Sequence, residues 1–309
     1  MMLELNNYYI QELENLTDLF TNIFVIIDDI YNEIIPIGIR NRRNIKDSKL
    51  SDSEIITISI VGELLTIDSE KSFFSLLKRE YKELFPRLGD RTRFNRTKRN
   101  LHLVISKIRG YISEFMQLYS NNIRVIDSMP IPVCEFGRAR FSKCFKGEAS
   151  YGICASKKET YFGFKFHALT TVDGFITPAN IDDRNAVWDL CDKYRSISII
   201  GDKGYINKRL TPELKSERDI DLLFLKRENS RDNYPKEVRQ LLFKVRRRIE
   251  TSFSQLTEQL NLNKVKSKSM LGFITRTSIK VLAHNISFLI NKLMRNDDSM
   301  AKIKRLVFG

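Results

Sequence analysis

The stretch YFGFKFHALTTVDGFITPANI, residues 161–181, decides the fold class, because it contains two runs of similar composition that meet at Asp173-Gly174. Both runs are rich in aromatic and β-branched residues, which favour strands. An Asp-Gly pair readily adopts the positive φ angles of a tight hairpin turn. The sequence therefore predicts two antiparallel strands, from Tyr161 to Val172 and from Gly174 to Ile181.

Three more strands are predicted around this hairpin. They cover residues 123–133 (IRVIDSMPIPV), 196–202 (SISIIGD) and 221–226 (DLLFLK). A short helix is predicted from Asn185 to Tyr194. A long helix is predicted from about Pro235 to Leu260, where apolar residues recur every three or four positions. Strands interspersed with helices predict an α/β fold, in which a mixed sheet is flanked by helices.

Residues 1–118 predict an all-helical region that precedes the sheet. Apolar residues keep helical spacing there, and Gly and Pro are scarce after Gly38. The sequence Ser51-Asp52-Ser53-Glu54 has the form of a capping box, which marks the start of a helix. A second helix is predicted from about Asp68 to the residue before Pro86.

A third helix is predicted from about Asp90, and its first turns carry a basic cluster that includes Arg91, Arg93 and Arg96. Positive charge at a helix N-terminus is unfavourable, so another interaction should compensate for it. One interpretation is a helix-turn-helix-like module that presents these residues to a DNA groove. The other is a solvated basic face on an ordinary helical bundle. The pattern alone leaves both open.

The charge balance favours a polyanionic partner. The chain has 309 residues, and 52 Lys and Arg against 38 Asp and Glu leave a formal net charge of +14. Such an excess favours nucleic acid. An anionic membrane is the weaker interpretation, because the apolar run of residues 20–27 is far shorter than the roughly 20 residues of a spanning helix. The N-terminus lacks the features of a secretion signal, so we expect a cytoplasmic protein that joins the nucleoid when bound to DNA.

The cysteines and histidines do not predict a zinc site. The chain has four cysteines and three histidines, and the spacing of the cysteines matches no zinc-finger or zinc-ribbon pattern. A chain of this size does not need disulfides to hold a core, so we expect free thiols.

Two carboxylates follow apolar runs in the predicted strands. Asp127 ends the run Ile123–Ile126, and Asp202 ends the run Ile197–Gly201. Open sheets bind ligands beyond such strand ends, and two neighbouring carboxylates can share a divalent cation. The alternative is structural, because each Asp could simply begin a turn.

A third carboxylate, Glu250, lies on the predicted long helix. Its position is about 100° round from Ile249, at the margin of an apolar stripe that should face the sheet. Arg246 and Arg247 precede it by four and three residues on the same side, where they could hold phosphates. The alternative is an exposed Arg246–Glu250 ion pair worth about 0.3 to 0.5 kcal/mol. The stripe consists of Val238, Leu242, Val245, Ile249, Phe253, Leu256 and Leu260.

Four segments, in this order, make the sequence resemble DDE transposases of bacterial insertion sequences, in particular the insertion sequence 982 family. The segments are IDSMPIPVC (126–134), YFGFKFHALTTVDGFITPANIDD (161–183), GDKGYI (201–206) and RRRIETSFSQL (246–256). The resemblance covers residues from about 120 to 285. It implies a ribonuclease-H-like fold with DNA as substrate.

The resemblance also implies the chemistry of the site. In such enzymes two Asp and one Glu coordinate two Mg²⁺ or Mn²⁺ ions, and these roles fall on Asp127, Asp202 and Glu250. Lys203 and Tyr205 flank the second Asp. Arg247 and the segment Thr251 to Gln255 accompany the Glu, and all are candidates for contacts with phosphate or with the ligands. Water would first free a 3′-OH at the end of the element, and this hydroxyl would then attack target DNA.

The resulting expectation has three parts: residues 1–118 as a helical DNA-binding region, 119–295 as a ribonuclease-H-like DDE catalytic domain, and 296–309 as a basic tail. Partners would be terminal inverted repeats, target DNA and further copies of the chain, as a homodimer or larger oligomer. A nuclease or resolvase that cannot join strands, and a non-catalytic DNA-binding regulator, remain the alternatives. The roles of Asp183, His167 and Trp188 stay open.

Overall fold

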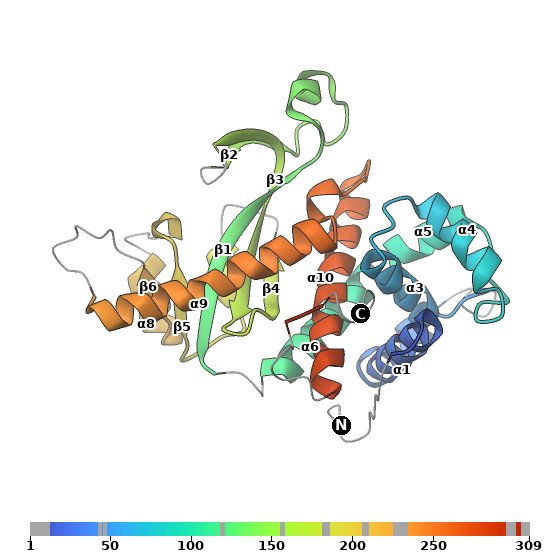
Figure 1. Ribbon diagram of the computed structural model, residues 1–309, viewed down its shortest axis with the longest axis horizontal. Coiled ribbons are helices and arrows are strands. Elements are labelled where there is room, and N and C mark those ends of the chain that lie inside the picture. Colours follow the sequence, from blue (N-terminus) through green and yellow to red (C-terminus); the bar gives the residue numbers. More distant parts are fainter. Residues whose placement is uncertain are drawn as a thin grey trace. The chain divides into compact units, whose positions relative to one another are not determined.

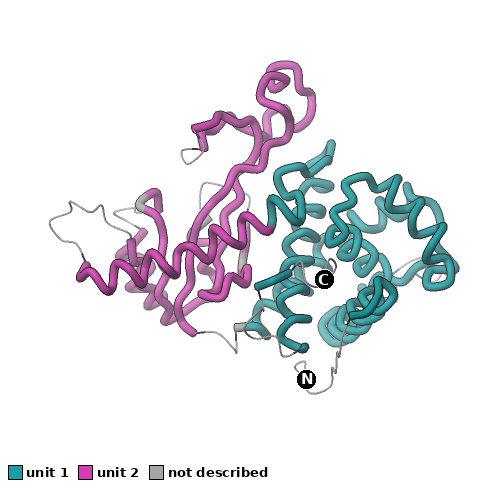
Figure 2. The backbone as a smooth tube through the Cα atoms, viewed as in Figure 1, with its two compact units in different colours: residues 1–116, 256–309 teal, residues 117–255 magenta. Residues whose placement is uncertain are grey.

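The computed structural model describes residues 13–42, 45, 48–117, 121–154, 158–180, 186–205, 210–224, 234–294 and 301–303. The chain divides into two compact units, shown in Figure 2. Unit 1 combines Met1–Met116 with Leu256–Gly309, and unit 2 is the continuous segment Gln117–Gln255. Among the described residues every strand lies in unit 2, whereas unit 1 is helical.

Unit 1 is built from helices of both ends of the chain. The first group is α1 (Leu16–Ile34), α2 (Ile37–Arg40), α3 (Asp52–Leu64), α4 (Glu70–Glu80), α5 (Arg91–Asn100) and α6 (His102–Gln117). The second group is the 3₁₀ turn η5 (Leu262–Lys264) and the long helix α10 (Met270–Leu293). The all-helical N-terminal region predicted from the sequence is therefore confirmed.

Local sequence signals explain where these helices begin and end. The capping box is present, because the Ser51 hydroxyl accepts from the Glu54 N–H and the Glu54 carboxylate accepts from the Ser51 N–H. The single helix predicted from Asp90 is instead two helices that meet at Leu101. The Leu101 N–H donates to the last carbonyls of α5, and the Leu101 side chain is buried. The chain changes direction at this residue.

The core of unit 1 surrounds α3, which packs against α1 and α10. Almost every side chain from Ile55 to Val61 is buried, so α3 has no solvent-facing side along this stretch. Charged groups are buried with it. Glu63 on α3 pairs with Lys280 and Arg276 of α10, and Lys280 also donates to the Leu260 carbonyl. These pairs fix α10 on α3.

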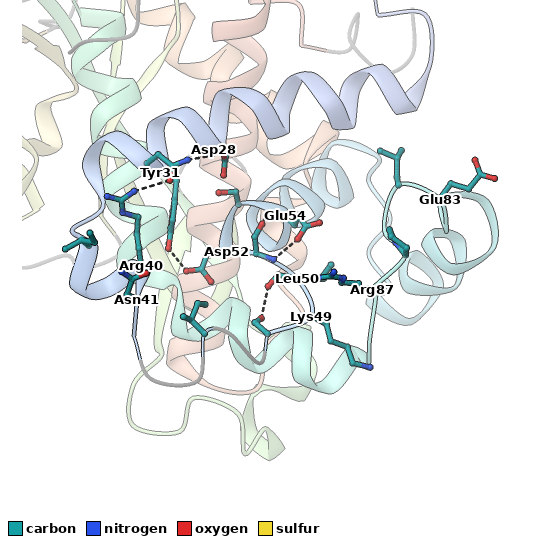
Figure 3. Close-up of a pocket in the computed structure, with 18 residues that line it drawn as sticks. Asp28, Tyr31, Arg40, Asn41, Lys49, Leu50, Asp52, Glu54, Glu83 and Arg87 are labelled. Carbon is teal, nitrogen blue, oxygen red and sulfur yellow. Dashed lines mark hydrogen bonds between the residues drawn. The ribbon is translucent and has the colours of Figure 1, made fainter.

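A pocket of about 850 Å³ lies in unit 1 and is lined by α1, the segment before α3 and the segment after α4. Its wall contains the Asp52 carboxylate, which accepts from the Tyr31 hydroxyl at 2.7 Å and from both terminal nitrogens of Arg42 at 2.5 and 2.7 Å. Figure 3 shows Tyr31 and Asp52 pointing toward one another. Burial and the Asp52 carboxylate raise the pKa of Tyr31 to about 12.

Unit 2 contains a six-stranded mixed sheet with the strand order β2-β3-β1-β5-β6, and β4 also pairs with β3. β1 is antiparallel to β3 and parallel to β5, and β5 is parallel to β6. Figure 1 shows α9 running across the strands of this curled sheet. The strands are β1 (Ile123–Pro132), β2 (Ser150–Cys154), β3 (Glu159–Thr171), β4 (Ile176–Asn180), β5 (Ser198–Gly201) and β6 (Asp221–Phe224). The predicted mixed α/β architecture with flanking helices is confirmed.

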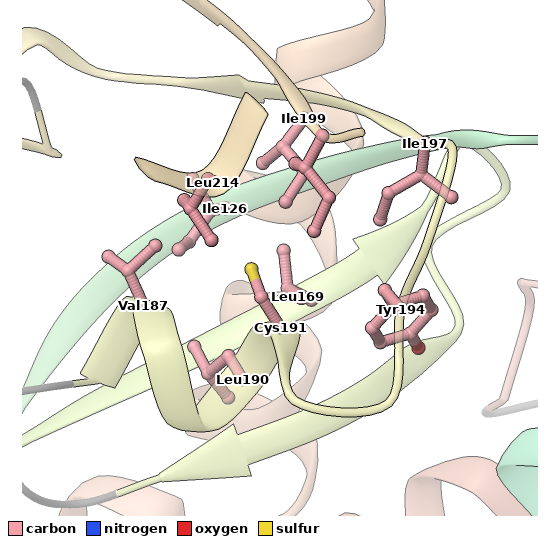
Figure 4. Packing of buried hydrophobic residues seen from close by; sticks show 10 residues of the cluster. Ile126, Leu169, Val187, Leu190, Cys191, Tyr194, Ile197, Ile199 and Leu214 are labelled. Carbon is pink, nitrogen blue, oxygen red and sulfur yellow. The ribbon is translucent and has the colours of Figure 1, made fainter. Parts of the chain in front are cut away.

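Different helices cover the two faces of this sheet. One face carries Ile126, Leu169 and Ile199, which pack with α7 (Ala186–Cys191) and α8 (Leu210–Arg218) around the buried Cys191, as Figure 4 shows. The opposite face carries Ile200, which packs with Leu242 of α9 (Lys236–Ser254). Successive side chains of a strand point to opposite faces of the sheet. The position of a residue along its strand therefore determines which of these helices it contacts.

Several elements differ from the sequence predictions. The long helix ends as α-helix at Ser254 and continues as the π-helical turn η4 (Gln255–Gln259). The short helix η2 (Phe136–Phe141) and the strand β2 were not predicted, and neither was α8. Helix α10, which falls within the predicted catalytic domain of residues 119–295, packs in unit 1, where it contacts α3. No described helix is long and apolar enough to cross a membrane. The four cysteines form no disulfide in the structure.

Candidate active site

The register of the parallel ladder aligns two of the predicted acidic residues. Ile123 pairs with Ser198 and Val125 with Ile200. Continuing this register by two residues sets Asp202 opposite Asp127 on adjacent strands, which lie about 4.8 Å apart. The close approach at Gly201 supports the extension, because a Cβ there would lie 2.7 Å from the Ile126 side chain. β1 and β5 are neighbouring strands, which is the condition for the two carboxylates to share a cation.

The same register sends both Asp side chains to one face of the sheet. Asp127 follows Val125 by two residues and Asp202 follows Ile200 by two residues, so both share the face that α9 covers. Asp202 comes directly after β5, as predicted. Asp127 is not at a strand end but in the middle of β1, because Ser128 to Pro132 continue the ladder with β3.

The helix that covers this face carries Glu250. This helix is α9, which packs against β1, β3 and β5. Glu250 is exposed, whereas its neighbour Ile249 is fully buried, and this agrees with its predicted place at the margin of the apolar stripe. Leu242, Ile249 and Phe253 of the stripe are buried, while Val238 at the start of the helix is largely exposed.

A buried hydrogen bond fixes the height of α9 on the sheet. The Ser252 hydroxyl donates to the Gly174 carbonyl at 2.7 Å. Gly174 is the turn residue between β3 and β4 and has the positive φ of 95° that the Asp-Gly pattern predicted. Phe253 adds a ring contact with Phe166 of β3, at 6.1 Å between centroids. The sequence does not predict these contacts of α9, because they join residues far apart in the chain.

Asp127 is the electrostatic centre of the group. Burial raises its pKa above the ordinary value, and the negative charges of Asp202 and Glu250 raise it further. The Ser128 N–H, which donates to Asp127 at 2.8 Å, and the positive charge of Arg246 lower the pKa, but burial dominates. The three predicted carboxylates are therefore close enough to influence one another. A cation bound among them would relieve their repulsion.

Arg246 connects α9 to Asp127. Its guanidinium lies 3.6 Å from the Asp127 carboxylate, and its Nε is buried without a hydrogen-bond partner. The alternative predicted from the sequence was an ion pair of Arg246 with Glu250, one turn further along the same helix. A partly buried arginine with an unused donor suits a phosphate oxygen, which can accept more than one N–H.

The donor set suits Mg²⁺ or Mn²⁺, because carboxylate oxygens are the preferred ligands of these ions. Arg246 supports this assignment, because its guanidinium already places a positive charge beside the partly buried carboxylate of Asp127. In the part of the chain that the structure describes, no three His, Cys, Asp or Glu side chains are grouped closely enough to hold a metal ion. Coordination by Asp127, Asp202 and Glu250 would therefore require their side chains to draw together.

His167 and Tyr205 lie on the opposite face of the sheet. His167 of β3 is opposite Ser128, is buried, and has its Nδ1 3.2 Å from the Tyr205 hydroxyl. Tyr205 ends the 3₁₀ turn η3 (Lys203–Tyr205) that follows Asp202. The contact between His167 and Tyr205 therefore holds the turn after Asp202 against β3, the strand that pairs with β1 at Asp127. The sequence left the role of His167 open, and the family resemblance made Tyr205 and Lys203 candidates for contacts with phosphate or with the ligands.

The remaining predicted residues are spread over both units. Arg247 is exposed on α9, and the Trp188 ring packs beneath the Arg218 guanidinium at 4.8 Å. Asp183 and the Lys203 side chain lie outside the described residues. In unit 1, the three basic residues of α5 that the sequence singled out are exposed, whereas Lys98 of the same helix is largely buried and pairs with Glu70. The Asp90 carboxylate at the start of α5 accepts from the Arg93 N–H at 3.1 Å, which offsets the unfavourable basic turn. The exposed residues are Arg91, Arg93 and Arg96.

Residues 118–270 match the family described as the Transposase DDE domain. These residues form a transposase DDE domain. Comparison with curated proteins and with solved structures gave no match. The DDE domain includes the whole described sheet and α9, and the three candidate carboxylates occur within it in the order Asp, Asp, Glu. Assignment of the catalytic roles to Asp127, Asp202 and Glu250 remains a prediction, as does membership of the insertion sequence 982 family.

Proposed function

We propose that this protein is a transposase of an insertion sequence, of the 982 family, which binds the ends of its element, cleaves DNA and joins the 3′-OH ends to target DNA. One observation carries the proposal. Within a transposase DDE domain, the strand register aligns Asp127 with Asp202, and their face of the sheet is the one that α9 covers with Glu250. We infer that the sheet is of the ribonuclease-H-like kind.

The chain's own residues would provide a negatively charged centre with basic neighbours. Asp127, Asp202 and Glu250 would hold two Mg²⁺ or Mn²⁺ ions, which supply Lewis acidity and activate water when bound. Arg246 and Arg247 would hold phosphate oxygens beside this centre, and Lys203 and Tyr205 would support the second Asp. The scissile phosphate would therefore be oriented by α9 on one side and by β1 and the end of β5 on the other.

Water is the first nucleophile in this proposal, and it releases the 3′-OH of the element. The freed 3′-OH is the second nucleophile and attacks a phosphodiester of target DNA, whose own 3′ oxygen leaves. Each step breaks one P–O bond and forms one, so no covalent bond to the protein is needed. The same three carboxylates serve both steps.

End recognition would lie in the helical N-terminal region. The exposed Arg91, Arg93 and Arg96 of α5 and the excess of positive charge support contacts with the DNA backbone. We infer that residues 1–118 bind DNA, residues 119–295 provide the catalytic chemistry and residues 296–309 form a basic tail. Pairing of two element ends would require at least a homodimer on DNA.

The test uses purified protein, Mg²⁺ and labelled DNA that carries the element's terminal repeats. The proposal expects cleavage at the repeat end and a joined product with target DNA. Cleavage without joining would identify a nuclease or resolvase, and binding without cleavage would identify a DNA-binding regulator. A footprint on the repeats that persists after deletion of residues 49–118 would contradict the role of the helical region.

A further inference from the structure

An exposed arm leaves the sheet between β1 and β3. It consists of η2, β2 and the loop between them, residues 136–154, and Figure 2 shows it extending away from the rest of unit 2. β2 pairs only with the first residues of β3, from Glu159 to Gly163. Neither the sequence prediction nor the family match gives this arm a function.

The arm presents large apolar side chains to solvent. Phe141 is 84% exposed and Ile153 is 75% exposed, and Phe136 and Tyr151 are also exposed. Exposed apolar side chains gathered on one projecting element mark a binding surface more often than scattered single ones do. Three of the four are aromatic, so the surface offers flat rings as well as apolar area.

Basic residues are interleaved with these rings. Four basic residues and one acidic residue leave the arm with a charge of +3. All four basic side chains are exposed, and they are Arg138, Arg140, Lys143 and Lys146. An aromatic surface with such a charge matches the combination that binds nucleic acid strands, where rings stack on bases and cations contact phosphates.

Ring contacts order the arm around Phe141. Phe145 anchors the loop by an edge-on contact with Phe164 of β3, at 5.5 Å between centroids. Tyr151 packs on Phe162 at 4.9 Å, and Phe136 packs on Tyr151 at 6.0 Å. The Tyr161 ring covers Gly152 so closely that a Cβ there would lie 2.5 Å from it. An ordered arm loses little conformational entropy when it binds.

A second copy of the chain fits this surface less well than DNA does. Association of two arms with each other would bring their positive charges together, which costs free energy at an interface. DNA offers the opposite charge. A base face is accessible to a ring only where bases are unpaired or at a duplex end, so the arm suits single-stranded DNA better than continuous duplex.

We propose that the arm binds unpaired nucleotides of DNA, with Phe141 stacking on a base and the basic residues of the arm contacting phosphates. This inference rests on the proposed function in so far as DNA is the substrate. It adds a site distinct from the carboxylates of the sheet and from α5. Unpaired nucleotides would arise beside a cleaved element end, where the arm would hold the displaced strand.

The test compares two labelled DNAs that share one terminal-repeat duplex, one blunt and one with a short unpaired tail. Fluorescence anisotropy at fixed salt should show that the full-length protein binds the tailed DNA more tightly. Phe141→Ala should weaken binding of the tailed DNA by about tenfold, a typical loss for one stacked base. Binding of the blunt DNA should not change, which also shows that the variant is folded.

Matched variants separate stacking from other effects. Phe141→Leu should lose affinity as Phe141→Ala does, whereas Phe141→Trp should retain it, and its fluorescence should be quenched by the tailed DNA. Ile153→Ala, on the same arm, should have little effect. Arg140→Gln should weaken binding and lower the salt dependence by about one phosphate contact.

Three outcomes would overturn the proposal. Equal binding of tailed DNA by Phe141→Ala and the parent would remove the stacking role. An equal loss from Phe141→Ala and Ile153→Ala, accompanied by a lower molar mass in solution, would assign the arm to self-association. An equal loss on blunt and tailed DNA would show duplex binding. In all three cases cleavage and joining by the parent would still support the proposed function, so the two failures are distinguishable.

Discussion

The Arg246 guanidinium lies 3.6 Å from the Asp127 carboxylate, so a cation of α9 faces the central acidic residue of β1. Asp127 needs this partner because it is partly buried and is close to the negative charges of Asp202 and Glu250. The pair therefore joins the helix that carries Glu250 to the strand that carries Asp127.

Asp127→Asn should abolish cleavage and leave binding to element ends intact. The change keeps the size of the side chain but removes the charge that would hold a metal ion. We expect cleavage to fall by at least about 10²-fold, the usual scale for losing one charge-stabilising group. Gel-based cleavage and filter-binding assays on the same DNA measure the two effects. Activity equal to that of the parent would contradict the assignment of the triad.

Asp127→Asn should also stabilise the metal-free protein at neutral pH. Because the pKa of Asp127 is raised in the folded state, its charged form opposes folding once the pH exceeds the unfolded value. The cost is absent below the ordinary pKa of 3.8 and is complete above the raised folded value. Thermal melts should show a gain at pH 7 that shrinks toward pH 4. Addition of Mg²⁺ should stabilise the parent more than the variant.

Arg246→Gln should move the acid limb of the pH–rate profile to higher pH. The positive charge of Arg246 lowers the pKa of Asp127, so its removal lets that pKa rise, and the ionised carboxylate is then reached at higher pH. Lys244→Gln removes an exposed charge of the same helix and is the matched control. An acid limb at the same pH in both variants would show that Arg246 does not act on Asp127.

Ser252→Ala should loosen α9 on the sheet. The change removes a buried donor and leaves the Gly174 carbonyl unsatisfied, which costs about 1 to 3 kcal/mol. Chemical denaturation measures this loss. Thr251→Ala is the control for stability, since its exposed hydroxyl bonds only to the Arg247 carbonyl of its own helix. If both changes cost the same, the bond to Gly174 does not fix the helix.

Lys280→Met should destabilise unit 1 strongly. Lys280 is buried, and burial lowers its pKa while the Glu63 carboxylate raises it. Removing the ammonium leaves Glu63 with one partner fewer in a buried place, which costs about 3 to 5 kcal/mol. The double variant Glu63→Gln and Lys280→Met should recover part of this loss in urea unfolding. Additive losses would argue against coupling of the two charges.

Much of the secondary structure could be predicted because its signals are local. The Asp-Gly turn, the apolar run before Asp202 and the capping box at Ser51 each depend on a few adjacent residues. The sequence could align Asp127 with Asp202 only on the condition that their two strands are neighbours. The parallel pairing of β1 with β5 meets this condition.

The missed features depend on contacts between distant residues. The arm was missed because its rings are ordered by contacts with Phe162 and Phe164 of β3, which are distant in the chain from Phe145 and Tyr151. Asp127 was predicted to lie at a strand end because it follows the run Ile123–Ile126, but β1 continues through Pro130 and Pro132. Proline is tolerated there because the ladder with β5 ends at Val125, so this part of β1 keeps only β3 as its ladder partner.

Unit 1 is assembled from two segments that flank unit 2 in the chain, and this has a consequence for biosynthesis. The buried side chains of α3 pack partly on α10, which the ribosome makes some two hundred residues later. Unit 2 is continuous and can fold during translation, whereas α3 must wait for the last helix. A nascent chain stopped at Gln255 would therefore expose the apolar side of α3 to proteases and chaperones, and only full-length chains would complete the helical unit.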